Sequence, residues 1–207
     1  MLHHKARLSD FVLAPIKVIV LAALPLAAGV EIGNRASAGD GITGATRPAR
    51  DAMQMFDVSL ASGYRALADT LEQAGQDPGS SSNDWADAQY FAVKATAAGR
   101  GDNDGPENTN SWALAPIDRA QIESARPRLI AAAAQMPEIA RTANLIAAKA
   151  LATAQVKFDC WIERAEEAAK GEGQTEDCHK AFQIALTEFD AAVGGQSIAA
   201  AIHPPRP

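Results

Sequence analysis

Apolar residues recur at helical spacing along most of the chain. The first clear stripe has five apolar members at steps of three or four residues: Phe56, Leu60, Tyr64, Leu67 and Leu71. Steps of three and four return to one face of an α-helix, so this stripe predicts a helix that buries that face. Gly75 is a suitable residue to end it. We therefore expect the first helix at residues 54–74.

Capping residues and prolines mark four further helices. Asn83, which follows two serines, is an N-cap candidate, and Pro116 and Pro137 suit the first positions of helices. Pro127 falls inside one of the predicted helices, where we expect a kink or a new helix start near Ala125. The four predicted ranges are 83–98, 117–135, 137–169 and 176–193.

The segment from Glu138 to Lys170 contains no proline or glycine and predicts the longest helix of the protein. Its expected buried face has eight members: Ile139, Ala143, Ile146, Ala150, Ala154, Phe158, Trp161 and Ala165. The last helix has an apolar stripe of its own: Cys178, Phe182, Leu186, Phe189 and Val193. Gly194 and Gly195 are expected to end that helix.

The amino-acid composition agrees with an all-α fold. Aromatic residues make up 5% of the chain, alanine is abundant, and β-branched residues form no long cluster after residue 31. Such a composition favours helices over strands. We expect a bundle of about five helices over residues 54–193, with a disordered leader at 39–53 and a flexible tail at 194–207.

The N-terminus has the pattern of a secretory signal peptide. Basic residues precede thirteen uncharged residues at positions 18–30, a stretch too short for a membrane span. Ala36 and Ala38 stand at the spacing that signal peptidase recognises. We therefore expect residues 1–38 to be removed when the chain is exported.

Retention of the apolar segment is the alternative. Residues 11–30 would then anchor the protein in the membrane, although Lys17 lies within them. A cation near the bilayer centre costs ~2–3 kcal/mol, which makes this segment a poor anchor. Contact with a membrane is expected only if the segment is retained.

Charge and motif content argue against several functions. The net charge is −6 and no run of Lys or Arg exceeds two residues, so nucleic acid is not an expected partner. The four histidines are scattered, and neither cysteine has a second ligand at metal-site spacing, so we expect no metal and no cofactor. No hydrolase, metalloprotease or phosphate-binding motif occurs, and we expect no catalytic residue.

The two cysteines are expected to form one disulfide. An even pair of cysteines in an exported chain meets an oxidising compartment. Cys160 and Cys178 fall on consecutive predicted helices, each beside the apolar stripe of its helix. The bridge would staple the C-terminal hairpin, with Phe158, Trp161 and Phe182 packed around it. Two unconnected buried thiols are the alternative.

The predicted helix lengths place the two cysteines at different levels. Cys160 lies about ten residues before the connecting loop and Cys178 about four residues after it, so straight helices would leave them ~9 Å out of level. A bridge therefore requires that the long helix ends early, near Glu167, or that the segment 168–176 folds back.

Two sequence runs carry a resemblance to a known family. The run DWADA at 84–88 is followed by FAVKA at 91–95, and FDCW at 158–161 is followed by ERAEE at 163–167. These runs resemble the N-terminal helical region of OmpA-family lipoproteins of alphaproteobacteria, over about residues 56–192. The resemblance implies a helical module of the cell envelope that lies in the periplasm and is associated with the outer membrane.

The chain differs from that family at the two features that attach the family's members to the membrane and to the cell wall. Val30 stands where the family has the lipidated cysteine that follows the apolar region. The sequence given ends at Pro207, where the family continues into a peptidoglycan-binding OmpA domain. The resemblance therefore implies an envelope module without the wall-binding activity, which belongs to that domain.

The predicted function is a non-enzymatic structural or interaction module of the periplasm. We expect it to bind another envelope protein through a groove between helices. Glu163, Glu166 and Glu167 are candidates for an acidic contact strip, and a solvated helix face is the alternative interpretation. A membrane-anchored accessory subunit of a larger complex is the second candidate function, and an enzyme of an unrecognised class is the third.

Overall fold

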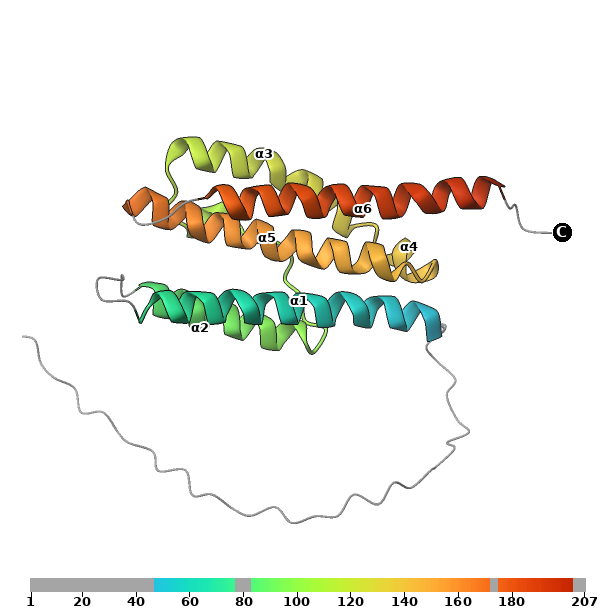
Figure 1. Ribbon diagram of the computed structural model, residues 1–207, viewed down its shortest axis with the longest axis horizontal. Helices are drawn as coiled ribbons and strands as arrows, with labels where there is room; N and C mark the ends of the chain where they lie inside the picture. Colours follow the sequence, from blue (N-terminus) through green and yellow to red (C-terminus); the bar gives the residue numbers. More distant parts are fainter. Residues whose placement is uncertain (1–46, 77–82, 172–174, 203–207) are drawn as a thin grey trace, which may run out of the picture. The chain divides into compact units, whose positions relative to one another are not determined.

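The computed structural model describes residues 47–76, 83–171 and 175–202 (Figure 1). These residues form helices, turns and loops and contain no strand, which confirms the all-α prediction. Five of the helices are long, as expected, and one short helix lies between two of them. Their bounds are α1 Arg47–Ala74, α2 Asn83–Ala98, α3 Pro116–Ala133, α4 Met136–Arg141, α5 Leu145–Lys170 and α6 Glu176–Ile202, with a 3₁₀ turn, η1, at Thr109–Ser111.

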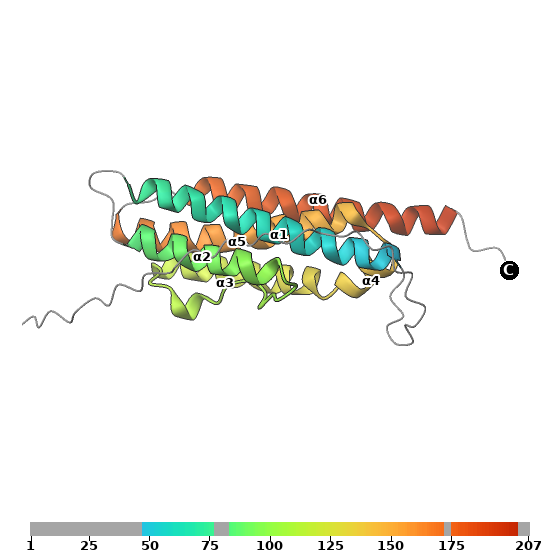
Figure 2. The same cartoon turned by 90° about the horizontal axis from the view of Figure 1, so that it is seen from below.

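Helix α5 is the central element of the bundle. In Figure 1 it runs between α1 and α6, and it packs against both of them. Helix α2 packs along α1, and α3 packs against α5. Figure 2 shows the short α4 beside the first turns of α1. Sixteen of the 26 residues of α5 are buried, as in a helix that is covered on nearly all sides.

The apolar stripes that the sequence predicts form most of the core. The first stripe is buried in full: Phe56, Leu60, Tyr64, Leu67 and Leu71. On α6, the buried members of the stripe are Phe182, Leu186 and Phe189. Each fully buried side chain of this size contributes about 1.5–3 kcal/mol of transfer free energy, so tertiary packing is the main source of helix stability here.

Helix α1 begins at Arg47, so the predicted disordered leader at 39–53 is wrong for its last seven residues. Ala52, within these residues, is fully buried, and α1 packs against α4 as well as α5. The extra turns of α1 are thus stabilised by a tertiary contact, which sequence periodicity does not reveal. The rest of the leader and the predicted signal peptide lie outside the described residues.

The single helix predicted at 137–169 is wrong, because the chain breaks it into α4 and α5. Asn144 caps the start of α5: its side-chain oxygen accepts a hydrogen bond from the N–H of Ala147 at 3.0 Å. Its amide nitrogen donates to the carbonyl of Ala192 in α6 at 3.1 Å. Ala143 adopts φ 53°, a left-handed conformation that costs a non-glycine residue about 1–2 kcal/mol.

The break also changes which residues face the core. Ile146 belongs to the predicted buried face but is 73% exposed. From Ala150 onward the predicted face is buried, as far as Ala165. The prediction was therefore right for the helix after the break and wrong across it, because the residues on the two sides of the break belong to different helices.

Helix α3 passes through Pro127 without a break, so of the two predicted outcomes near Ala125, a kink or a new helix start, the new start is wrong. The preceding residue, Arg126, helps to hold this part of the helix in place. Its guanidinium donates hydrogen bonds to the carbonyls of Glu107 at 2.8 Å and Pro106 at 3.1 Å. These bonds hold the middle of α3 against the preceding loop. They offset part of the free energy that is lost because proline cannot form the usual backbone hydrogen bond.

Helix α6 continues through Gly194 and Gly195 to Ile202, so the predicted helix end at residue 193 is wrong. The predicted flexible tail is likewise wrong as far as residue 202, and residues 203–207 lie outside the described part of the chain. A glycine lowers helix propensity by only about 1 kcal/mol relative to alanine. Two glycines therefore need not end a helix that packs along α5 over most of its length.

Helices α1 and α5 approach each other closely at Gly63. A Cβ atom at this position would lie 2.7 Å from one methyl carbon of Val156 and 3.3 Å from its Cβ. Valine is branched at Cβ and has one preferred rotamer in a helix, so Val156 has little room to move away. Glycine in the middle of α1 is therefore explained by this close packing.

Candidate functional site

The disulfide predicted from the sequence joins the first turn of α6 to the second half of α5. Cys160 and Cys178 are bonded, with Cα atoms 5.8 Å apart, which confirms the C-terminal staple. The long helix does not end near Glu167, because α5 continues to Lys170. The first turn of α6 instead lies level with Cys160. Residues 172–174 of the connection lie outside the described residues.

Aromatic side chains pack beside the staple, as the sequence predicts. Phe158, Trp161 and Phe182 are all buried. The ring centroids of Phe158 and Phe182 are 5.4 Å apart, and those of Phe158 and Trp161 are 6.2 Å apart. His179 adds a ring that the sequence did not indicate, stacked on Trp161 with a centroid distance of 3.9 Å. This stacking depends on how α6 is turned against α5.

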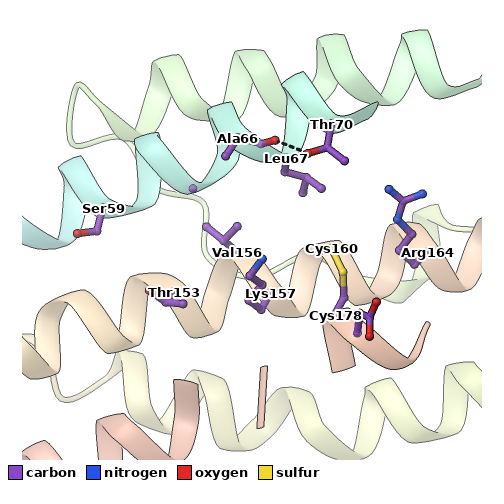
Figure 3. A pocket seen from close by; sticks show the side chains of 12 residues that line it. Ser59, Ala66, Leu67, Thr70, Thr153, Val156, Lys157, Cys160, Arg164 and Cys178 are labelled. Carbon is purple, nitrogen blue, oxygen red and sulfur yellow. Dashed lines mark hydrogen bonds between the residues drawn. A yellow bond between two sulfur atoms is a disulfide. The ribbon is translucent and has the colours of Figure 1, made fainter. Parts of the chain in front are cut away.

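The disulfide lines a pocket of about 540 Å³ between α1, α5 and the start of α6, which we call the disulfide pocket (Figure 3). The α1 residues that line it are uncharged: Ser59, Gly63, Ala66, Leu67 and Thr70. Its two cationic residues, Lys157 and Arg164, come from α5, and Asp177 comes from α6. The side of the pocket that α1 forms is therefore uncharged, and the side that α5 forms carries two cations.

A second pocket of about 590 Å³ continues along α5 towards the start of that helix. Its lining is mainly apolar and includes Met55 of α1, Ile146 of α5 and Ala192 of α6. Thr153 lines both pockets, so they adjoin, and we call the two pockets together the α5 groove. From Leu145 to Arg164, its floor is about 29 Å long at 1.5 Å per residue.

Two cations flank Cys160 along α5. Lys157 and Arg164 stand three residues before it and four residues after it, which places all three on one face of the helix. Arg164 is paired: its Nη1 lies 2.5 Å from Oε2 of Glu167, and its Nε lies 3.4 Å from Oε2 of Glu163. Lys157 has no ion pair within the described ranges.

The predicted acidic contact strip does not form on the surface. Glu163 and Glu167 are buried, with exposed fractions of 1% and 6%. Glu166 is largely covered, and its carboxylate accepts hydrogen bonds from the N–H of Ala113 at 2.9 Å and from Lys170 at 3.0 Å. The prediction of this strip was wrong because other elements cover α5 on the side where an amphipathic helix would carry solvated charges.

Burial raises the pKa of the Glu163 carboxyl to about 9, although the nearby Arg164 acts in the opposite direction. The neighbouring Glu167 carboxylate raises it further. Neither oxygen of Glu163 has a hydrogen-bond partner in the part of the chain that the structure describes. The raised pKa therefore favours the protonated form of the Glu163 carboxyl at neutral pH.

Glu163→Gln is expected to raise the free energy of unfolding at pH 8 by about 2 kcal/mol or more, with little change at pH 4.5. The folded-state pKa of about 9 exceeds the ordinary value of 4.5. Ionisation therefore favours the unfolded chain, and stability falls as the pH rises from about 4.5 to 9. Glutamine is neutral at every pH in this range, so the variant does not lose this stability as the pH rises.

Urea unfolding of both chains at the two pH values measures the effect of Glu163→Gln. Glu166→Gln is the matched control, because its carboxylate is paired and it should show no gain at pH 8. A loss of stability at pH 8 in Glu163→Gln would contradict a protonated Glu163.

A buried charge network lies around Asp159 of α5. This carboxylate is fully buried and accepts hydrogen bonds from Tyr64 at 2.5 Å, from Lys94 at 2.7 Å and from the N–H of Glu107 at 2.8 Å. The Glu107 carboxylate also pairs with Lys94 and accepts a hydrogen bond from Tyr90 at 2.6 Å. The network thus joins α1, α2, α5 and the loop before η1.

Opposing effects set the charges in this network. Burial raises the pKa of Asp159 to about 6, while Lys94 and Tyr64 act to lower it. Burial also acts to raise the pKa of Glu107, but Lys94 together with the hydrogen bonds from Tyr90 and Trp112 outweighs it, so the pKa is lowered overall. Lys94 therefore compensates two carboxylates at neutral pH. Sequence reasoning missed this site, because Lys94 and Asp159 have the pattern of ordinary polar residues on amphipathic helices.

The described residues contain no group of three or more His, Cys, Asp or Glu side chains that could hold a metal ion. None of the helices in these ranges is both long enough and apolar enough to cross a membrane. Residues 11–30, the alternative anchor, lie outside the described residues. Comparison of the chain with protein-family models, curated proteins and solved structures finds no match.

Proposed function

We propose that this chain is a non-enzymatic, exported helical module that binds another protein of the cell envelope. The observation that carries the proposal is the disulfide between Cys160 and Cys178. Disulfides form and persist in oxidising compartments such as the periplasm and are rare in the cytosol. The disulfide and the predicted signal peptide at residues 1–38 thus support the same location by independent reasoning.

The α5 groove is the binding surface in this proposal. Its length of about 29 Å suits a helix of about 20 residues, and a groove between helices is a common site for an amphipathic helix of a partner. The end near Ile146 is apolar, and that side chain is 73% exposed. A partner helix would cover Ile146 and lie along α5 between α1 and α6.

Export is tested with the full-length chain expressed in a bacterium that has a periplasm. We expect a periplasmic protein whose mass lacks residues 1–38 and whose cysteines react with an alkylating reagent only after reduction. A cytoplasmic chain with an intact N-terminus and reactive thiols would overturn the proposal. A membrane-bound chain of full mass would instead support the anchored accessory subunit.

Binding in the groove is tested with a photo-reactive amino acid placed at Thr153, where the two pockets adjoin. We expect one discrete cross-linked product in intact envelopes. The control places the same amino acid at Val93, which is 69% exposed on α2, and should give no product. Equal products from both positions, or none from Thr153, would contradict a binding role for the groove.

A further inference from the structure

We propose that the Cys160–Cys178 disulfide exchanges with a small anionic thiol that enters the disulfide pocket. This activity goes beyond the proposed binding role. It also does not depend on that role, because it concerns the chemistry of the pocket and not a partner in the rest of the α5 groove.

The first argument is that the disulfide is reached from a pocket. Both cysteines line the disulfide pocket, whose volume of about 540 Å³ lies within the range of small-molecule sites. Figure 3 shows the sulfur–sulfur bond at α5, with Lys157 on one side along the helix and Arg164 on the other. Cys160 is 5% exposed, whereas Cys178 is only partly buried. An incoming thiol therefore meets Cys178 first.

The second argument is the charge around Cys160. Positive charges favour the thiolate over the thiol, and a cysteine with a lowered pKa is the better leaving group. Lys157 has no ion pair among the residues that the structure places, whereas Arg164 shares its charge with Glu167. Lys157 therefore contributes most of the effect and also attracts an anionic thiol.

Charges on α6 act on the other cysteine. Asp177 lines the disulfide pocket, and its carboxylate disfavours an anion beside Cys178. Cys178 lies in the first turn of α6, where the helix dipole favours negative charge and offsets part of that repulsion. The difference between the two surroundings makes Cys160 the leaving group and Cys178 the attacked atom.

The reaction is a thiol–disulfide exchange. The thiolate of the incoming molecule attacks Sγ of Cys178 and forms a new sulfur–sulfur bond with it. The bond between Cys178 and Cys160 breaks, and its electron pair remains on Sγ of Cys160 as a thiolate. The product carries a mixed disulfide on Cys178 and a thiolate on Cys160 beside Lys157. The incoming thiol is the only reactant that the protein requires.

The test treats the purified, oxidised protein with reduced glutathione at pH 7.5, followed by an acid quench, alkylation and peptide mass spectrometry. We expect one glutathione per chain, attached to Cys178, with Cys160 alkylated and the helical circular dichroism retained. A disulfide that stays intact in the folded protein but is reduced in urea would overturn the proposal. Attachment to Cys160 instead of Cys178 would also overturn it.

Two pairs of variants separate exchange in the pocket from exchange through unfolding. Lys157→Met is expected to slow formation of the mixed disulfide by about 3-fold or more, whereas Lys149→Met, two turns earlier on α5, should not. Ala66→Trp fills the disulfide pocket and is expected to slow the reaction by about 10-fold. Ser62→Trp is its control on an exposed position of α1. Equal rates in all four variants would show that the pocket plays no part.

Discussion

Lys94→Met is expected to lower the free energy of unfolding at pH 7 by about 3–5 kcal/mol. Lys94 is the cation that pairs with both Asp159 and Glu107. Methionine keeps much of the side-chain length but removes the charge. Asp159 is fully buried, so the loss of its partner leaves a charge inside the bundle that stays unpaired or takes up a proton.

Urea unfolding at pH 7 and pH 4 measures this effect. The loss should shrink at pH 4, because the unfolded Asp159 then also binds a proton, near its ordinary pKa of 3.8. Adding Asp159→Asn to Lys94→Met should restore part of the stability, since the uncompensated carboxylate is gone. Lys149→Met is the control for an exposed lysine. A loss no larger than in this control would show that the network contributes little.

Cys160→Ser is expected to lower the free energy of unfolding by about 2–4 kcal/mol, with the helix content largely unchanged. The bridge limits the conformations of the unfolded chain by joining α5 to α6, while the folded hairpin is also held by Phe158, Trp161 and Phe182. For a chain of this size, the melting temperature should fall by roughly 2–4 °C per kcal/mol. Thermal unfolding followed by circular dichroism measures both quantities.

The second cysteine provides the control for this prediction. Cys178→Ser removes the same bridge and should cause a similar loss, and the double variant should lose no more than either single variant. Reduction of the unchanged protein should reproduce the loss. An unchanged melting temperature in Cys160→Ser would show that the bridge does not stabilise the fold.

Some helix positions were predictable from local signals, although the local signals at Pro127 and at Gly194 and Gly195 were misleading. Helix α2 has the predicted bounds, 83–98, and Gly99 directly follows its last residue. The bridge between Cys160 and Cys178 was predictable because the chain has only these two cysteines, on consecutive helices. In each case the information lies in residue types and in spacings of a few residues.

Other features depended on contacts that are remote in the sequence. The first turns of α1 pack against α4, and Asn144 holds the start of α5 to the carbonyl of Ala192 in α6. The burial of the polar residues of α5 also depended on such remote contacts. Glu163 and Asp159 belong to a helix that looks amphipathic in sequence, but both are buried.

The sequence by itself determined the all-α class, the five long helices, most of their apolar stripes and the pairing of the two cysteines. Only the tertiary structure decided the break before α5, the partners of Asp159, the burial of Glu163 and the pocket beside the disulfide. Periodicity and capping reflect interactions within a few turns of one helix. Whether a charged side chain of α5 meets water or another helix depends instead on which elements cover α5, and those elements lie far away in the sequence.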